Sequence, residues 1–79
     1  MDNLELDIFL KNLGKSIKDK RKTCKITQQE LAYRCDIEKP NIVRIETGRT
    51  NPTTKTLKII AKALNIKVMD LFDFEEEKI

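Results

Sequence analysis

The sequence predicts an all-α domain, a compact fold of five helices in a single domain that spans residues 1–79. Three observations lead to this fold class. Only two glycines and two prolines occur among the 79 residues, and 39% of the residues are apolar. The apolar residues recur at intervals of three and four along most of the chain, which is the period of an amphipathic helix.

A chain of this length buries only about 60% of the surface that its unfolded form exposes, so we expect modest stability.

The first helix is predicted from Leu4 to about Lys22. One apolar stripe supports it: Leu6, Phe9, Leu10, Leu13 and Ile17. Asn3 is placed to cap the start of the helix. Gly14 lies within the pattern and costs about 1 kcal/mol against alanine. It either separates an N-terminal extension, residues 1–12, from the helix proper, or marks a close contact, and we expect one long helix.

Two short helices follow, and they are separated by a tight turn. Residues 27–30 read Thr-Gln-Gln-Glu, a capping box that starts a helix over 28–35 with Thr27 as its N-cap. A proline at position 40 favours the start of the next helix, over 40–47, and Gly48 ends it. Asp36 lies in the turn, where aspartate is among the few residues that tolerate a positive φ. Two helices joined in this way cross at a steep angle, so residues 27–47 are predicted to form a helix-turn-helix.

Two further helices complete the predicted fold. Thr53 is placed to cap a fourth helix over 54–64, and Asn65 is suited to end it. A short fifth helix is predicted for Val68 to Phe72. Residues 73–79 form an acidic tail that we expect to be frayed.

The charges are distributed unevenly. The net charge is +3, but residues 11–25 carry seven bases against one acid, and both ends of the chain are acidic. A basic run is commonly a solvated helix face. Because this one adjoins the predicted helix-turn-helix, it favours a surface that attracts phosphates.

The residues that several classes of protein function require are missing from the sequence. There is no histidine, no glycine-rich phosphate loop and no nucleophile paired with a base, so we expect no enzyme. Cys24 and Cys35 lack a CxxC partner, so we expect no metal site and no other cofactor. No basic segment followed by an apolar run opens the chain, and no stretch approaches the roughly 18 apolar residues of a membrane span. We therefore expect a cytoplasmic protein without a membrane or small-molecule partner.

The motifs along the chain, taken in order, resemble the phage-repressor/Cro type of helix-turn-helix, the XRE family. The resemblance covers roughly Leu13 to Phe72. It rests on these segments: Arg21, Thr27 to Ala32, Ile42 to Gly48, Pro52, Leu57 to Leu64, and Leu71-Phe72. All of them occur in the family's order and register. The resemblance implies a fold of the lambda-repressor-like type.

The resemblance also implies roles for individual residues. Those facing DNA bases would be Lys39, Pro40, Asn41, Val43 and Arg44. Those near DNA phosphates would be Thr27, Gln28, Thr47 and Arg49. Arg21 and Glu46 would form a structural salt bridge between the first helix and the recognition helix.

The residue types suit these roles. Arg44 can bond guanine O6 and N7, and Asn41 can pair with adenine. Lys39 can contact guanine or serve a phosphate, and Val43 can pack on a thymine methyl group or on the edge of the core. Three residues depart from the family pattern: Asp36 replaces the usual turn glycine, Glu38 replaces the usual Ser or Thr cap, and Pro40 removes a backbone donor.

Two functions of different classes follow. The first is a sequence-specific regulator of transcription that binds double-stranded DNA. It would act as a homodimer through its C-terminal helices, around Asn65 to Phe74, on a near-palindromic operator, in phage, plasmid, restriction–modification or antitoxin-type control. The second is a helix-turn-helix fold used as a protein–protein interaction module without DNA readout.

Overall fold

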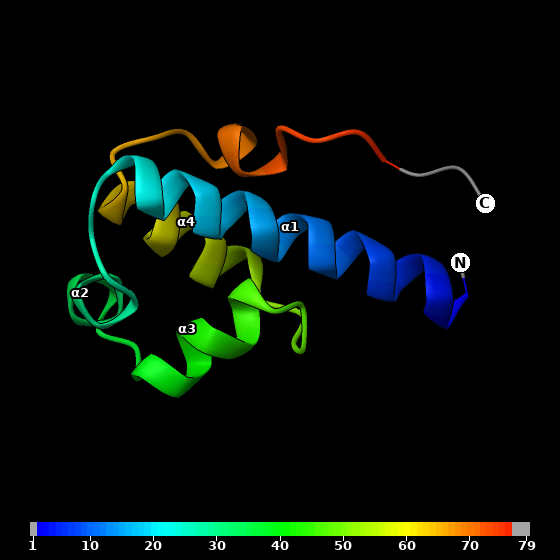
Figure 1. The fold of residues 1–79 in the computed structure, drawn as a ribbon, viewed down its shortest axis with the longest axis horizontal. Helices are drawn as coiled ribbons and strands as arrows, with labels where there is room; N and C mark the ends of the chain where they lie inside the picture. Colours follow the sequence, from blue (N-terminus) through cyan, green and yellow to red (C-terminus); the bar gives the residue numbers. More distant parts are fainter. Residues whose placement is uncertain (1, 77–79) are drawn as a thin grey trace.

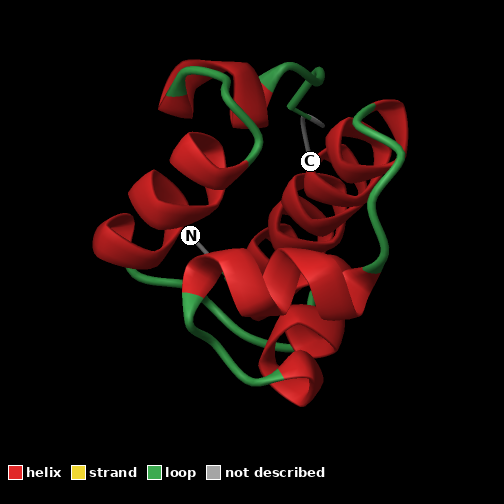
Figure 2. Cartoon of the chain, turned by 90° about the vertical axis from the view of Figure 1, so that its left-hand side faces the viewer, coloured by secondary structure: helices red, strands yellow, loops and turns green. Residues whose placement is uncertain are grey.

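A computed structural model describes residues 2–76 and places five helical elements in the predicted order. They are α1 (Asn3–Thr23), α2 (Gln28–Cys35), α3 (Lys39–Glu46), α4 (Thr54–Ala63) and the 3-10 helix η1 (Val68–Phe72). Figure 1 shows α1 lying between α3 and the segment that carries η1, and both contact it. Figure 2 shows only helices and loops over the described residues. The all-α class and the helix-turn-helix arrangement of α2 and α3 are confirmed.

The predicted short fifth helix is present at Val68–Phe72 but is a 3-10 helix, so residues 2–76 hold four α-helices instead of five. Its first turn closes through a bond between residues three apart, from Asp70 N to Lys67 O at 2.9 Å. The Asp70 carboxylate also accepts from Lys67 N at 2.9 Å, which fixes the start of the turn. A segment of five residues has too few i→i+4 partners to favour an α-helix, and 3-10 helices are used in such short pieces.

The helix boundaries agree with the predicted ones to within one residue, but one cap differs. The Thr27 and Thr53 hydroxyls accept bonds from Glu30 N at 3.0 Å and Thr56 N at 3.1 Å, as expected of N-caps. The Glu30 carboxylate accepts from Arg34 Nε at 2.9 Å, so only the Thr27 half of the predicted capping box is seen. Asp2, not Asn3, caps α1: its carboxylate accepts from Glu5 N at 2.8 Å. A carboxylate at this position also stabilises the positive end of the helix dipole.

The turn between α2 and α3 is closed by Asp36 in the left-handed conformation, with φ 55°. The backbone N–H of Ile37 donates to Ala32 O at 3.0 Å, and that of Asp36 to Tyr33 O at 3.2 Å. These bonds satisfy the carbonyls at the end of α2, which would otherwise lack partners. Aspartate therefore takes the conformation that glycine usually provides in this turn.

The core lies where α1 to α4 and η1 meet. Its buried members come from every element: Leu13, Ile17, Leu31, Ala32, Cys35, Ile42, Ile45, Leu57, Ile60, Ala61, Leu64 and Leu71. Both cysteines are free thiols; Cys24 is exposed, and Cys35 is buried. Burial raises the pKa of the Cys35 thiol, which stays neutral and packs as a small apolar side chain.

The predicted acidic tail begins as a packed segment. Phe74 packs on Phe9 with ring centroids 5.6 Å apart, and Asp73 pairs with Lys20 at 3.6 Å. Asp73 and Phe74 thus contact α1, with the Asp73 side chain 81% exposed, and the frayed tail stays a prediction. Residues 77–79 of the predicted tail lie outside the described residues.

Gly14 marks a close contact, because α1 runs unbroken through it. A Cβ atom at Gly14 would overlap the Ile45 carbonyl oxygen and lie 2.6 Å from that of Glu46. These are backbone atoms of α3, so they cannot rotate away as a side chain would. Glycine is required here because the backbones of two helices touch.

Gly14→Ala is expected to lower the free energy of unfolding. Overpacking against a fixed backbone costs about 1–3 kcal/mol, which outweighs the roughly 0.5–1 kcal/mol that alanine gains over glycine within a helix. Urea unfolding followed by circular dichroism measures the change. Lys18→Ala, at an exposed position of the same helix, is the control and should have little effect. A Gly14→Ala protein as stable as the Lys18→Ala protein would contradict the close contact.

Candidate nucleic-acid interface

A buried carboxylate, that of Glu46 at the end of α3, joins three helices. Its Oε2 accepts from Arg21 Nε at 2.7 Å, and its Oε1 accepts from Arg21 Nη2 at 3.1 Å. Gln28, the first residue of α2, donates its side-chain amide to the same Oε1 at 3.0 Å. Arg21 also donates from Nη1 to the Ile26 carbonyl at 2.8 Å, in the loop before α2. This network therefore fixes α1, α2 and α3 relative to one another.

The charges in this network are tolerated because each has partners. The side chains of Arg21 and Glu46 are only 8% and 1% exposed. Removing a charge from water is costly, and the cost is offset only when the pair is well aligned and its remaining donors and acceptors are bonded. The two parallel bonds between a guanidinium and a carboxylate meet this requirement and set the rotation of α3 about its axis.

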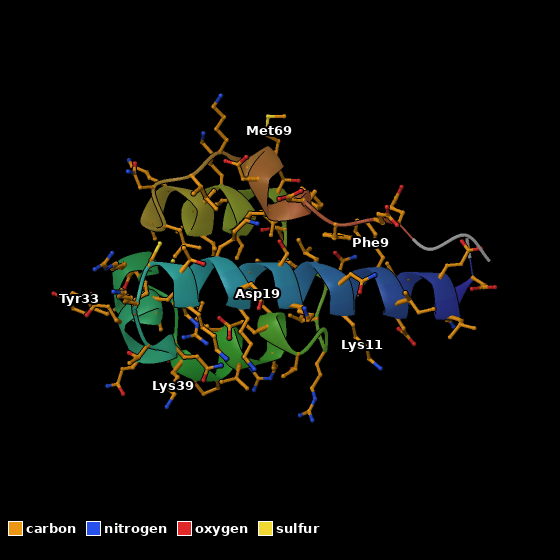
Figure 3. The ribbon with its side chains drawn as sticks, turned by 45° about the horizontal axis from the view of Figure 1, so that its top comes forward. Phe9, Lys11, Asp19, Tyr33, Lys39 and Met69 are labelled. Atoms are coloured by element: carbon orange, nitrogen blue, oxygen red, sulfur yellow. The ribbon has the colours of Figure 1, made fainter. Side chains whose placement is uncertain are left out.

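The rotation of α3 exposes the residues predicted to face DNA bases. Ile42 and Ile45 are buried on its inner side. On the outer side Lys39, Pro40, Asn41 and Arg44 are exposed, and Val43 is half-buried. Lys39 projects away from the body of the molecule in Figure 3. The base-facing candidates thus share one surface of one helix.

The four residues predicted to lie near phosphates are engaged to different degrees. The Thr27 oxygen already caps α2, and the side-chain amide group of Gln28 points inward to Glu46. The hydroxyl of Thr47 donates to the Val43 carbonyl at 2.8 Å. Arg49 is exposed. Of the four, Arg49 is therefore the one with a charged side chain at the surface, and Gln28 can offer a phosphate its backbone N–H.

Lys39 lies beside the start of α2. Thr27, Gln28, Gln29, Arg21 and Lys39 line one depression of ≈ 390 Å³. An ammonium group next to the free N–H groups at a helix start forms an environment that suits an anion. The depression therefore brings Lys39 next to the start of α2.

A second depression, of ≈ 350 Å³, runs along the other edge of α3. It is lined by Asn41 and Arg44 together with Ile37, Ile45, Thr50, Asn51, Pro52, Thr53 and Thr56. Within it Arg44 donates from Nη1 to the Oδ1 of Asn41. The sequence analysis missed both this bond and the loop residues that face it. The bond could have been predicted from the spacing of Asn41 and Arg44, because residues three apart are neighbours on the surface of a helix.

Over residues 2–76, no group of three or more cysteine, aspartate or glutamate side chains is arranged to hold a metal ion. In the same range no helix combines the length and apolar character needed to cross a membrane.

Comparison with protein families identifies the fold. The helix-turn-helix family model matches residues 17–71, from the second half of α1 to η1. The chain belongs to the phage-repressor/Cro type of helix-turn-helix proteins. This assignment agrees with the order of motifs from Arg21 to Leu71-Phe72.

Relatives of this helix-turn-helix protein include regulators from archaea and phages. An uncharacterized HTH-type transcriptional regulator of Archaeoglobus fulgidus is 40% identical over 63 residues, which cover 80% of this chain and 89% of that protein. The ImmF control region 10 kDa protein of Bacillus phage phi105 is 43% identical over 56 residues, which cover 71% of this chain and 62% of that protein. The crystal structure of the restriction–modification controller protein C.Esp1396I matches with a TM-score of 0.75 and 31% identity, covering 82% of this chain and 84% of that chain.

Glu46→Gln is expected to lower the free energy of unfolding by about 3–5 kcal/mol, because it leaves a buried guanidinium without its counter-charge. Urea unfolding measures the loss. The control is Glu30→Gln, which removes the exposed pair between Glu30 and Arg34, 2.9 Å apart. An exposed pair contributes less than about 1 kcal/mol. Equal losses in the two variants would contradict the structural role of Glu46.

Proposed function

We propose that this protein is a transcriptional regulator that binds double-stranded DNA sequence-specifically, as a homodimer on a near-palindromic operator. The observation that carries the proposal is the outer face of α3, where the four exposed residues Lys39, Pro40, Asn41 and Arg44 form one continuous surface. The buried Arg21–Glu46 pair behind it holds that surface in a fixed orientation. Membership of the helix-turn-helix family supports the same function.

The dimensions and chemistry of α3 suit the major groove of DNA. Its eight residues give a length of about 12 Å, close to the roughly 12 Å width of that groove. In this arrangement Arg44 reads a guanine and Val43 packs on a thymine methyl group. Asn41 and Pro40 lie against neighbouring base edges.

Phosphate contacts at both ends of α3 would position the helix in the groove. At its start, Lys39 and the first N–H groups of α2, next to Thr27 and Gln28, face one strand. At its end, Arg49 and Thr47 face the backbone at the far side. Such contacts fix register but carry no sequence information.

The proposed dimer surface lies on the other side of α1 from α3. Met69 is 72% exposed and Phe72 38%. Phe72 belongs to an aromatic cluster with Phe9 and Phe74, in which ring centroids lie 5.6–6.3 Å apart. Met69 and Lys39 project from opposite sides of the molecule in Figure 3. An exposed apolar patch on a small protein is typical of an interface, and here it would include Phe9 of α1 as well as the C-terminal segment.

The relatives support a class of control. One relative is a phage control-region protein, and a solved structure of similar fold is a restriction–modification controller. We infer a regulator of this class, in a phage, plasmid, restriction–modification or antitoxin-type system.

One observation favours a second function, the protein–protein interaction module. Glu38 at the start of α3 makes no side-chain capping bond and is exposed beside the proposed DNA surface. An uncompensated carboxylate there opposes phosphates. If this effect dominated, α3 would meet a protein partner instead.

The first prediction for this function concerns DNA. Selection from a pool of random duplexes is expected to enrich a near-palindrome with half-sites about 34–36 Å apart. Binding to the enriched site should weaken steeply between about 50 and 200 mM salt, because bound cations are released from the phosphates. Arg44→Ala should relax the base preference, while Arg34→Ala, which removes an equal charge from α2, should preserve it. If no duplex is bound, the interaction module becomes the better description.

The second prediction concerns the dimer. Met69→Glu is expected to weaken self-association at least about tenfold, since it places a charge within the proposed apolar interface. Sedimentation equilibrium over a range of concentrations measures the dissociation constant. Tyr33→Glu is the control, because Tyr33 is 83% exposed on α2 and lies away from Met69 in Figure 3. A wild-type protein that remains monomeric at all concentrations, even with its selected site, would exclude the homodimer.

A further inference from the structure

On the outer face of α3, two of the proposed base-reading side chains are bonded to each other. Arg44 donates from Nη1 to the carboxamide oxygen of Asn41, one turn earlier in the helix. Both side chains are exposed, and both line the depression between α3 and the loop that leads to α4. The bond therefore lies within the surface that would meet DNA.

We propose that Asn41 is a positioning residue for Arg44, and that the two together form a reader of guanine. The inference rests on the proposed DNA-binding function. It changes the role of Asn41, which by residue type alone would pair with adenine.

The chemistry of the carboxamide carries this change. To read adenine, asparagine must accept a bond from adenine N6 and donate one to N7. The oxygen that would accept is directed at Arg44, so the groups that Asn41 can turn toward a base are its N–H donors. To read adenine, the Asn41 oxygen would have to give up its bond to Arg44 or accept from Arg44 and adenine N6 at the same time.

The chemistry of the guanidinium leaves Arg44 able to read guanine. Arginine has five N–H donors, and the bond to Asn41 uses one. Whichever Nη1 hydrogen is used, one edge of the guanidinium keeps its two parallel donors. That edge matches the O6 and N7 acceptors of guanine.

With the carboxamide oxygen bonded to Arg44, the pair offers mainly N–H donors to the groove. Its best complement is a guanine opposite Arg44 beside a second acceptor, such as a purine N7 or a thymine O4. Holding the guanidinium in advance also reduces the rotamer freedom that arginine loses on binding. The selected half-site is thus expected to contain a guanine whose readout depends on both residues.

A double-mutant cycle on the selected operator tests the proposal. The variants are Asn41→Ala, Arg44→Ala and the double substitution, and the measured quantity is the base preference at each position of the half-site. Arg44→Ala should lose about 5- to 150-fold preference for guanine at one position. Asn41→Ala should reduce the preference at that same position. The double variant should match Arg44→Ala within about twofold, because residues that act as a unit are not additive.

Two further variants separate positioning from general damage to the surface. Asn41→Asp keeps an oxygen acceptor for Arg44, so it should keep the guanine preference while its negative charge lowers the affinity for every site. Asn51→Ala removes a carboxamide from the same depression and should leave the guanine preference unchanged. Circular dichroism confirms that each variant is folded.

The outcomes distinguish the inference from the function on which it rests. If the wild-type protein enriches no site, the proposed DNA function fails and the inference fails with it. A second outcome is that a site is enriched but Asn41→Ala lowers the base preference at a different position, an adenine, and its effect adds to that of Arg44→Ala. In that case the inference is overturned and the function stands. Loss of the guanine preference in Asn41→Asp would likewise overturn it.

Discussion

The carboxylate of Glu46 is the constraint on which the arrangement of the helices depends. It is 1% exposed and receives donors from α1 and from α2, so the end of α3 can take only one orientation in which all these bonds form. A misplaced α3 would leave buried charges unpaired, which costs far more than a lost apolar contact. In a domain this small, one such network can determine the orientation of a helix that has only eight residues. It also turns the side-chain amide of Gln28 inward and so shapes the proposed interface indirectly.

The contact at Gly14 acts on the same end of α3. The carbonyls of Ile45 and Glu46 approach α1 so closely that no side chain fits between them. The ion pair fixes the rotation of α3, and the backbone contact fixes its distance from α1. The salt bridge alone would not fix the position of α3, because its long side chains can follow a displaced helix. The backbone contact at Gly14 does not allow such a displacement.

The parts of this fold that follow local rules could be predicted from the sequence. Thr27 and Thr53 mark helix starts through bonds to residues three positions on, and Asp36 and Asn65 adopt the left-handed conformation at helix ends. The features that depend on distant residues could not be predicted. The periodicity gave no means to choose between a break and a contact at Gly14, because the atoms that decide it lie about thirty residues away in α3. Gln28 has the residue type and position of a phosphate ligand, and its inward direction follows only from the location of Glu46. The sequence did not predict that Asp2 caps α1 or that Val68–Phe72 is a 3-10 helix. In each case the alternatives, a cap one residue later or an α-helical turn, differ by only a fraction of a helical turn.

In the proposed dimer, α1 connects the two surfaces that must act together. Its residues Gly14 and Arg21 hold α3 on one side. On the other side, Phe9 packs on Phe72 and Phe74, and Lys20 pairs with Asp73. Recognition of two half-sites requires the recognition helices of both subunits to keep a fixed separation, since the groove repeats at a fixed interval. A dimer formed through the apolar patch transmits its geometry to α3 through one continuous helix and has no flexible joint on the way. The helix-turn-helix family model begins its match at residue 17, and α1 extends well before that residue. These earlier turns then have a physical reason: they carry Phe9 to the patch and Gly14 to α3, so the same segment sets both the dimer contact and the position of the reading helix.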